Sequence, residues 1–242
     1  MSGGSGESLN DRVECLKDGV FYFETVIFKV EDTLFRVPKR GLNVAGTPFE
    51  TMFSLPPSDS GCIDGSSDEN PIVLEGSEAI TKANFRAFLG AIYNFTDKFP
   101  KTYEGLIGAL QLATMWEFSE LRNNLIQKAS PLVQSKDIHD RILVARLCKV
   151  KQWLFDAYKT LVLEKTHVDF RKLQSKGIDI QTILELLLIR DETGSLIGCP
   201  ERPVYCSQCW GSMVRTEEMS NLQTDASHKI NALFASEFAH MQ

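Results

Sequence analysis

Three cysteines and one histidine near the C-terminal end of the chain have the spacing expected of metal ligands. Cys206 and Cys209 form a C-x-x-C pair, in which two thiolates can bind one zinc ion from a single turn of backbone. Cys199 could supply a third ligand and His228 a fourth. Because a second tight pair is missing, reduced thiols in a loop remain the alternative to a structural zinc site.

No sequence motif for catalysis accompanies these residues. The phosphate-binding, dinucleotide-binding, nucleophile-elbow and zinc-protease patterns are all absent from the sequence. The histidines are scattered along the chain, and His139, in the first turn of an expected helix, is expected to face solvent. Thioredoxin-like redox chemistry is disfavoured because no β-α-β pattern precedes the cysteine pair. We therefore expect that the protein is not an enzyme.

The composition is typical of a folded protein in a reducing compartment. Of the 242 residues, 43% are hydrophobic and 24% are charged, and the net charge of −6 disfavours direct binding to nucleic acid. The longest apolar cluster, 183–189, is interrupted by Glu185 and is far shorter than a membrane span of about 20 residues. Residues 1–19 have no signal-peptide core and are expected to be flexible. Six cysteines without a leader indicate reduced thiols, so we expect the cytoplasm or the nucleus.

Alternating apolar residues predict a β-hairpin near the start of the chain. Val26, Phe28 and Val30 fall on one face of an extended segment, and the alternation resumes after a turn until Pro38, which cannot donate to a strand ladder. The segment 47–50, Thr-Pro-Phe-Glu, predicts a capping box with a threonine N-cap, a proline at the first helical position and a glutamate at N3. These signals together predict two strands followed by a short helix.

The period of the pattern then changes from that of a strand to that of a helix. After a short apolar strand at 72–74, Thr81 can cap a helix whose core-facing residues are Phe85, Phe88, Leu89, Ile92 and Tyr93. From residue 102 onward, a weak repeat with a 32-residue offset predicts two stacked helical hairpins. The corresponding apolar positions are Ala113, Phe118, Leu121, Leu125 and Ile126 in the first copy, and Ala145, Val150, Trp153, Ala157 and Tyr158 in the second.

Two further helices are expected in the C-terminal part of the chain. The first follows Asp179 as N-cap, and its apolar residues are Ile183, Leu184, Leu187 and Leu188. Residues 193–215, which include glycines, prolines and the three cysteines, are expected to form a loop. The second helix is expected to begin at Asp225. Its apolar stripe consists of Ile230, Leu233, Phe234 and Phe238. Such a stripe must cover either the chain's own helices or a partner.

The order of these elements resembles the BTB/POZ domain, and is most similar to the BTB-domain proteins abundant in fungi. The residues that carry the resemblance are VIFKVEDTLFRV at 26–37, PFETMFSLP at 48–56, Ile72-Val73-Leu74 and NFRAFLGAIYNF at 84–95. The resemblance implies an α+β fold at 20–128, in which helical hairpins cover a small sheet. It also implies an all-helical extension at 135–242 that contains the cysteine loop at 193–215.

In that family the domain is usually a non-enzymatic protein-interaction module. The resemblance therefore implies a scaffold or regulator that self-associates, with a homodimer as one possible form, and that binds other proteins. A first alternative is a substrate adaptor for a cullin-type ubiquitin ligase, because residues 138–162 resemble the helical pair that follows the domain in such adaptors. The surface at Tyr93, Phe95 and Phe99 is the expected contact for other proteins, including a cullin, although no hydrophobic-x-Glu element follows Tyr93. A second alternative is a zinc-stabilised regulatory protein built on the cysteine cluster.

Overall fold

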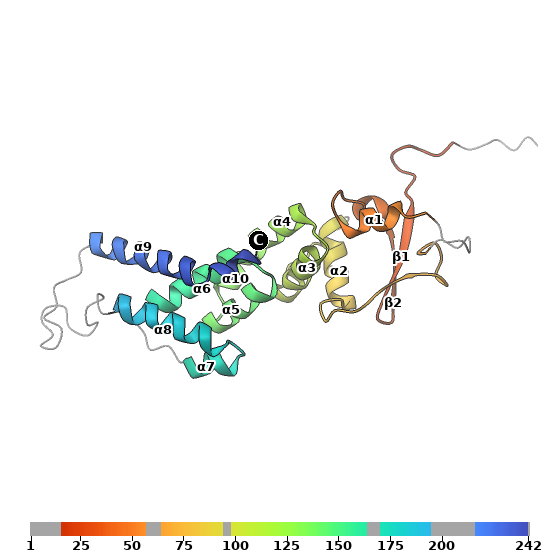
Figure 1. Ribbon diagram of the computed structural model, residues 1–242. Helices are drawn as coiled ribbons and strands as arrows, with labels where there is room; N and C mark the ends of the chain where they lie inside the picture. The colour runs from red at the N-terminus through yellow and green to blue at the C-terminus, as the bar shows by residue number, and fades with distance from the viewer. Residues whose placement is uncertain (1–15, 57–63, 94–97, 164–169, 195–215, 242) are drawn as a thin grey trace, which may run out of the picture.

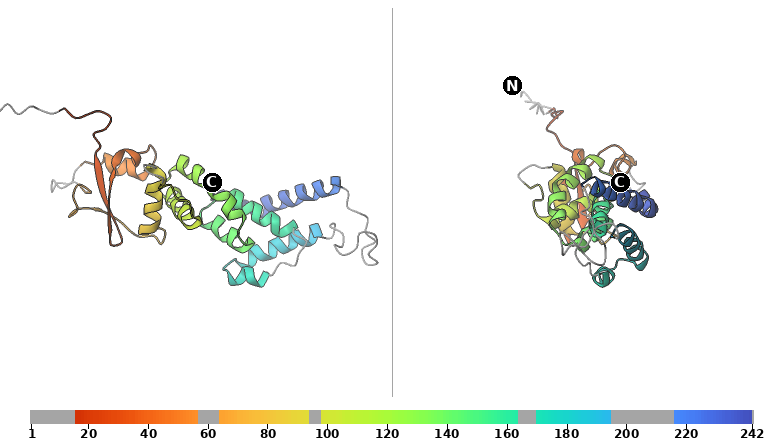
Figure 2. Two further views of the ribbon diagram at one scale, coloured as in Figure 1. Left: turned by 180° about the vertical axis from the view of Figure 1, so that it is seen from behind. Right: turned by 90° about the vertical axis from the view of Figure 1, so that its left-hand side faces the viewer.

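The computed structural model describes residues 16–56, 64–93, 98–163, 170–194 and 216–241. Within these residues the fold is α+β, with one three-stranded sheet and ten α-helices, so the predicted fold class is confirmed at this level. The molecule is elongated, with the sheet at one end and the helices α7 to α9 at the other (Figure 1). Figure 2 shows the same arrangement from behind and along the long direction.

The sheet has the strand order β2-β1-β3. β1 (Thr25–Val30) and β2 (Thr33–Pro38) form the predicted antiparallel hairpin, and β3 (Ile72–Leu74) lies parallel to β1 on its other side. Val26, Phe28 and Val30 are all buried on the face of β1 that packs against the helices, as the alternation predicted. The hairpin turns at Glu31, whose φ of 54° is the left-handed conformation that a tight turn requires.

A short 3-10 helix (Lys39–Gly41) follows β2, and α1 (Pro48–Ser54) then begins where the sequence predicts. The hydrogen bonds at the start of α1 nevertheless differ from those of a capping box, so that prediction is wrong in its contacts. The Thr47 hydroxyl donates to the carbonyl of Val44 instead of accepting from the helix. The Glu50 carboxylate accepts from the N–H of Gly46, one residue before the N-cap. Both side chains therefore fix the loop that leads into α1.

Six aromatic rings fill the space between the sheet and the first helices. Phe28 of β1 meets Phe49 of α1 and Phe85 of α2 (Lys82–Tyr93) edge to face, with ring centroids 5.8 and 5.6 Å apart. The cluster is completed by Phe88, Trp116 and Phe118. Edge-to-face pairs at these distances each add about 0.5–1.5 kcal/mol beyond the burial of apolar area.

The 32-residue repeat predicted from the sequence is present in the backbone. α3 (Tyr103–Met115) turns into α4 (Ser119–Gln134), and α5 (Ile138–Leu147) turns into α6 (Lys151–Leu163). In the first turn the N–H of Phe118 donates to Ala113 O, and in the second the N–H of Val150 donates to Ala145 O, both at 2.9 Å. The residue before each donor, Glu117 or Lys149, has a φ in the left-handed region (60° and 53°). α4 extends past residue 128, at which the sequence placed the end of the first domain.

Polar side chains connect one hairpin to the next. Arg122 of α4 is buried, and its guanidinium donates to Thr114 Oγ1 and to the carbonyls of Cys148 and Lys149 in the second turn. Trp153 Nε1 of α6 donates to Ser130 Oγ of α4. The two hairpins are therefore stacked through directed hydrogen bonds as well as apolar contacts.

Four helices form the C-terminal part, namely α7 (Phe170–Ser175), α8 (Ile180–Gly194), α9 (Thr216–Leu233) and α10 (Ala235–Ala239). α8 and α9 pack onto α6, and α7 packs onto α8. Asp179 caps α8 by accepting from the N–H of Thr182, as predicted. Asp225, predicted as the start of the tail helix, lies inside α9 and pairs with Lys229 one turn later, which explains why an acidic residue is found there.

The tail stripe covers the chain's own helices. Ile230, Phe234 and Phe238 are buried against α6, whereas Leu233, which was predicted to share their face, is half exposed. The hydroxyl of Tyr158 in α6 donates to Glu237 Oε2 at 3.0 Å, and thereby joins α10 to α6.

Arg146 of α5 lies against this contact. Its Nη2 donates to Tyr158 Oη and Thr182 Oγ1, while its Nε lies 2.7 Å from Glu237 Oε1 in an ion pair that is not aligned as a hydrogen bond.

None of the described helices combines the length and the apolar character that a membrane-spanning segment needs.

Candidate interaction groove

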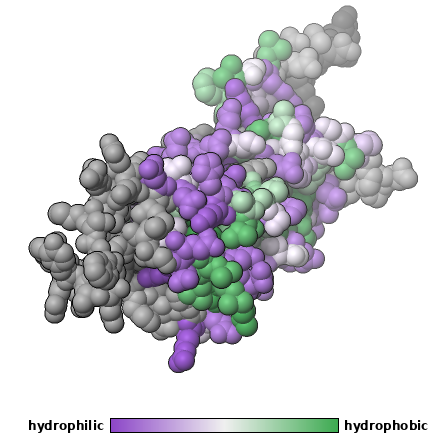
Figure 3. All heavy atoms as spheres, turned by 60° about the vertical axis from the view of Figure 1, so that its left-hand side comes forward, coloured by the Kyte–Doolittle hydropathy of each residue, from purple (hydrophilic) through white to green (hydrophobic). Residues whose placement is uncertain are grey.

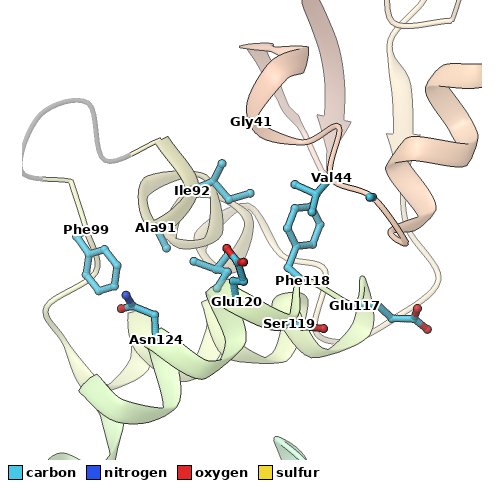
Figure 4. A pocket seen from close by; sticks show the side chains of 12 residues that line it. Gly41, Val44, Ala91, Ile92, Phe99, Glu117, Phe118, Ser119, Glu120 and Asn124 are labelled. Atoms are coloured by element: carbon cyan, nitrogen blue, oxygen red, sulfur yellow. The ribbon is translucent and has the colours of Figure 1, made fainter.

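An open groove of about 570 Å³ lies where the end of α2 approaches the start of α4 and the loop that follows β2 (Figure 4). Four stretches of the chain, far apart in the sequence, supply its walls. The lining residues are Gly41, Val44 and Ala45 from the loop, Ala91 and Ile92 from α2, Phe99, and Glu117, Phe118, Ser119, Glu120, Leu121 and Asn124 around the start of α4.

The loop after β2 is held against α2 by Tyr93. The Tyr93 hydroxyl donates a hydrogen bond to the carbonyl of Pro38, and its ring lies so close to Gly41 that a Cβ there would collide with it. Burial raises the pKa of Tyr93 well above its usual value, so the hydroxyl stays protonated and remains a donor. This contact fixes one wall of the groove.

The opposite wall is fixed by the turn between α3 and α4. The left-handed conformation of Glu117 directs Phe118 inward, where its ring packs on Phe88 and Phe49 at centroid distances of 5.2 and 5.8 Å. Phe118 is buried, whereas Leu121, one turn further along α4, is only partly buried. The groove therefore has an apolar floor that is rigidly attached to the aromatic core.

The charged residues that line the groove are acidic. Glu117 and Glu120 flank the start of α4, and no lysine, arginine or histidine is among the lining residues that the structure describes. In Figure 4 the Glu120 side chain points toward α2, and the Glu117 side chain points away from Asn124. Lys128 Nζ lies 4.9 Å from the centroid of the Phe99 ring, beside the groove. An apolar side chain beside a basic one would suit this surface, because it fills the floor and complements the charge.

The structure gives different outcomes for the three residues predicted as an interaction surface. Phe99 lines the groove. Tyr93 is not among the lining residues and instead holds a wall in place. Phe95 lies outside the described residues. The sequence missed the contribution of Glu117 and Glu120, although the repeat had marked Phe118 as one of its apolar positions.

The predicted zinc ligands remain untested by the described residues. Cys199, Cys206 and Cys209 lie outside them. His228 is exposed on α9 and lines a small polar depression of about 260 Å³ together with Lys159. Across the described ranges no group of three His, Cys, Asp or Glu side chains could hold a metal ion. A structural zinc ion therefore stays a prediction, which metal analysis of protein purified without chelators would test.

His139, predicted to face solvent, is buried. Its Nδ1 lies 2.7 Å from Asp137 Oδ1, and because a carboxylate oxygen only accepts, Nδ1 carries the proton. Its Nε2 has no hydrogen-bond partner among the described residues. The sequence prediction was wrong because the residue follows an N-cap aspartate that turns the imidazole back onto the helix.

Comparisons with known proteins return no relative for this chain. No protein-family model matches it, and neither the curated proteins nor the solved structures include a match. The resemblance to the BTB/POZ domain therefore stays a prediction.

Proposed function

We propose that this protein is a non-enzymatic interaction module of the BTB/POZ type that self-associates through the segment preceding β1. The proposal is supported by the apolar side chains that this segment exposes, which are Leu16, Val20, Phe21, Tyr22 and Phe23. Leu16 is 97% exposed and Phe21 is 77% exposed. Burying a large apolar side chain in an interface contributes about 1.5–3 kcal/mol, so five such side chains in one short segment favour association.

A second copy of the chain is the occupant that the sheet favours. β3 is an edge strand, and its Val73 is 53% exposed. An exposed edge presents unpaired backbone groups to which an extended segment can add as a further strand. In the BTB/POZ family, dimers often exchange the strand at the start of the domain, and the segment before β1 would make such an exchange here.

Sedimentation velocity over a range of concentrations tests self-association. We expect a species of twice the 27.2 kDa chain mass at micromolar concentration. The double variant Phe21→Ser, Phe23→Ser should weaken the association at least about tenfold, equal to about 1.4 kcal/mol. Leu55→Ser is the matched control, because Leu55 is 67% exposed at the end of α1, and it should leave the association unchanged. A wild-type chain that stays monomeric at tens of micromolar would exclude the proposal.

A substrate adaptor for a cullin-type ubiquitin ligase is the second candidate, and the groove favours it. Phe99, expected from the sequence as a partner contact, lines a concave surface with an apolar floor. Purified cullin N-terminal domain should bind the chain, and Leu121→Asp in the groove should weaken binding at least about tenfold. Asn123→Asp, on an exposed position of α4 outside the groove, should leave it unchanged. Failure of the wild-type chain to bind would remove the adaptor function while leaving self-association open.

A further inference from the structure

α8 has two apolar faces, and only one of them is covered by described residues. Ile183, Leu186 and Ile189 are buried against the neighbouring helices. Four other large apolar residues of the same helix are exposed, namely Ile180, Leu184, Leu187 and Leu188. Figure 3 shows an apolar patch at this end of the molecule, among otherwise polar side chains.

The exposed residues form a single stripe. Their spacing of i, i+4, i+7 and i+8 places them on one side of a helix, opposite the buried face. At 1.5 Å per residue the stripe is about 13 Å long, and it is about one helix diameter, ~10 Å, in width. Such a patch is too small for a stable dimer of folded chains, which needs about 800 Å² from each partner. It matches the apolar face of one short amphipathic helix.

The stripe lies in acidic surroundings. α8 carries Glu185, Asp191 and Glu192 but only one cation, Arg190, which gives it two net negative charges. The Arg190 guanidinium donates to Leu161 O on the covered side of the helix. Glu192 is paired with Lys229 of α9, but Lys229 also pairs with an acidic residue of α9, so the local balance stays negative.

Lys172 of α7 and Lys176, which follows α7, do not offset this charge, because each is paired with an aspartate of another element. Lys172 Nζ lies 2.7 Å from Asp137 Oδ2, and Lys176 Nζ lies 3.4 Å from Asp140 Oδ1, both at the start of α5. Arg171 of α7 is an exposed cation, so the acidic border of the stripe is the one that α8 itself supplies, with its two net negative charges.

We propose that the exposed face of α8, Ile180, Leu184, Leu187 and Leu188, is a docking site for an amphipathic helix of a partner protein whose apolar stripe is flanked by lysines or arginines. Four leucine-sized side chains at helical spacing supply the apolar contact, and the acidic border selects the basic flank. A second copy of α8 fits less well, because it would bring two net negative charges onto two others. This site is at the opposite end of the molecule from the segment before β1, and it does not depend on self-association.

A pair of synthetic peptides tests the site. The first is an amphipathic helix with leucines at i, i+4, i+7 and i+11 and lysines beside them, and the second has glutamates in place of the lysines. Fluorescence anisotropy should show that the basic peptide binds the full chain at least about tenfold more tightly than the acidic one, with an affinity that falls as salt screens the charges. Leu184→Ser with Leu188→Ser should weaken binding of the basic peptide at least about tenfold.

Two control variants separate this site from the rest of the surface. Leu55→Ser, at the sheet end, should bind the peptide as the wild type does, and so should Phe21→Ser with Phe23→Ser if the site is independent of self-association. Thermal unfolding of each variant checks that the fold is kept.

Three outcomes would overturn the proposal. Equal binding of both peptides would mean that the face is an unselective apolar surface. Absence of binding, or binding that ignores the Leu184 and Leu188 changes, would mean that the face is covered by the chain itself. Loss of self-association in the Leu184→Ser, Leu188→Ser variant would mean that a second copy occupies it.

Discussion

Asp137 lies at the start of α5, where its carboxylate holds two helices together. Lys172 Nζ of α7 donates to Oδ2 at 2.7 Å, and His139 Nδ1 of α5 donates to Oδ1 at the same distance. The hydrogen bond from Lys172, followed by that from His139, holds the pKa of the Asp137 carboxyl well below its usual value. A group with a lowered folded-state pKa stabilises the fold above its unfolded pKa, and the contribution is lost as the pH falls through the folded pKa.

Asp137→Asn should therefore lower stability in a pH-dependent way. We expect the difference in free energy of unfolding between wild type and variant to have its full size above about pH 5. It should shrink as the pH falls below about 4, which is the pKa of an aspartate in the unfolded chain. Urea unfolding at several pH values measures it. Asp140→Asn, which removes only a 3.4 Å contact to Lys176, should show a smaller difference at every pH. A constant difference for Asp137→Asn from pH 3 to pH 6 would contradict the assignment.

Lys149 is an exposed side chain on a backbone that favours glycine. Its φ of 53° costs a non-glycine residue about 1–2 kcal/mol, and glycine gives back about 0.5–1 kcal/mol of this through its extra freedom in the unfolded chain. Lys149→Gly should therefore raise the free energy of unfolding by about 0.5–1 kcal/mol in denaturant titration. Gln127→Gly, in the interior of α4, should lower it by about 1 kcal/mol, which shows that the gain belongs to the turn.

At the scale of the elements, Arg122 connects the first hairpin to the second. Its guanidinium donates to two carbonyls just after α5, and Arg122→Met would leave the buried Cys148 carbonyl and the partly buried Lys149 carbonyl without that donor. Because an unsatisfied buried polar group costs about 1–3 kcal/mol, the variant should lose about 2–3 kcal/mol of unfolding free energy. Arg36→Met, which breaks an exposed ion pair with Asp68, should cost less than about 1 kcal/mol in the same assay. Equal losses in the two variants would show that Arg122 adds nothing beyond a surface pair.

The sequence predicted these elements well where local signals set them. The hairpin, the N-cap at Asp179 and the repeated turn depend on residues within a few positions of one another, so periodicity and capping rules apply to them. The buried face of α8 was harder to predict, because so many of its residues are apolar that periodicity does not distinguish the covered face from the exposed one. The start of α9 was missed since an aspartate followed by a lysine at i+4 stabilises a helix interior as well as an aspartate caps an end.

At the scale of the whole molecule, the groove could not be derived from the sequence. Its walls come from 41–45, 91–92, 99 and 117–124, and their proximity depends on how α2 and α4 pack on the sheet. Only the roles of single residues could be predicted, such as Phe99 as a contact and Phe118 as an apolar position of the repeat. The charge of the groove follows from packing, because acidic residues at the start of a helix are common for reasons of local stability.

The packing of the tail on α6 should depend on Phe238. The ring is buried in α10 beside Phe155 of α6, with Lys151 Nζ 5.5 Å from its centroid. Phe238→Ala should cost about 3–5 kcal/mol. Hydrogen exchange should then speed up in α6 and α9 while the amides of β1 stay protected, because the packing that the Phe238 ring supplies lies far from the sheet. Leu233→Ala, at a half-exposed position of the same tail, should leave both regions unchanged. Reduced protection throughout the chain would instead indicate one cooperative unit.

The contact between Tyr158 and Glu237 has a consequence for the protein while it is being made. The two residues are 79 positions apart, and at a synthesis rate of about 5–20 residues per second α6 is complete roughly 4–16 s before its partner in α10 exists. During that interval the side of α6 that later receives α9 and α10 is open to water on the ribosome. We therefore expect the nascent chain to bind general chaperones after α6 emerges and to be released once the tail has been translated.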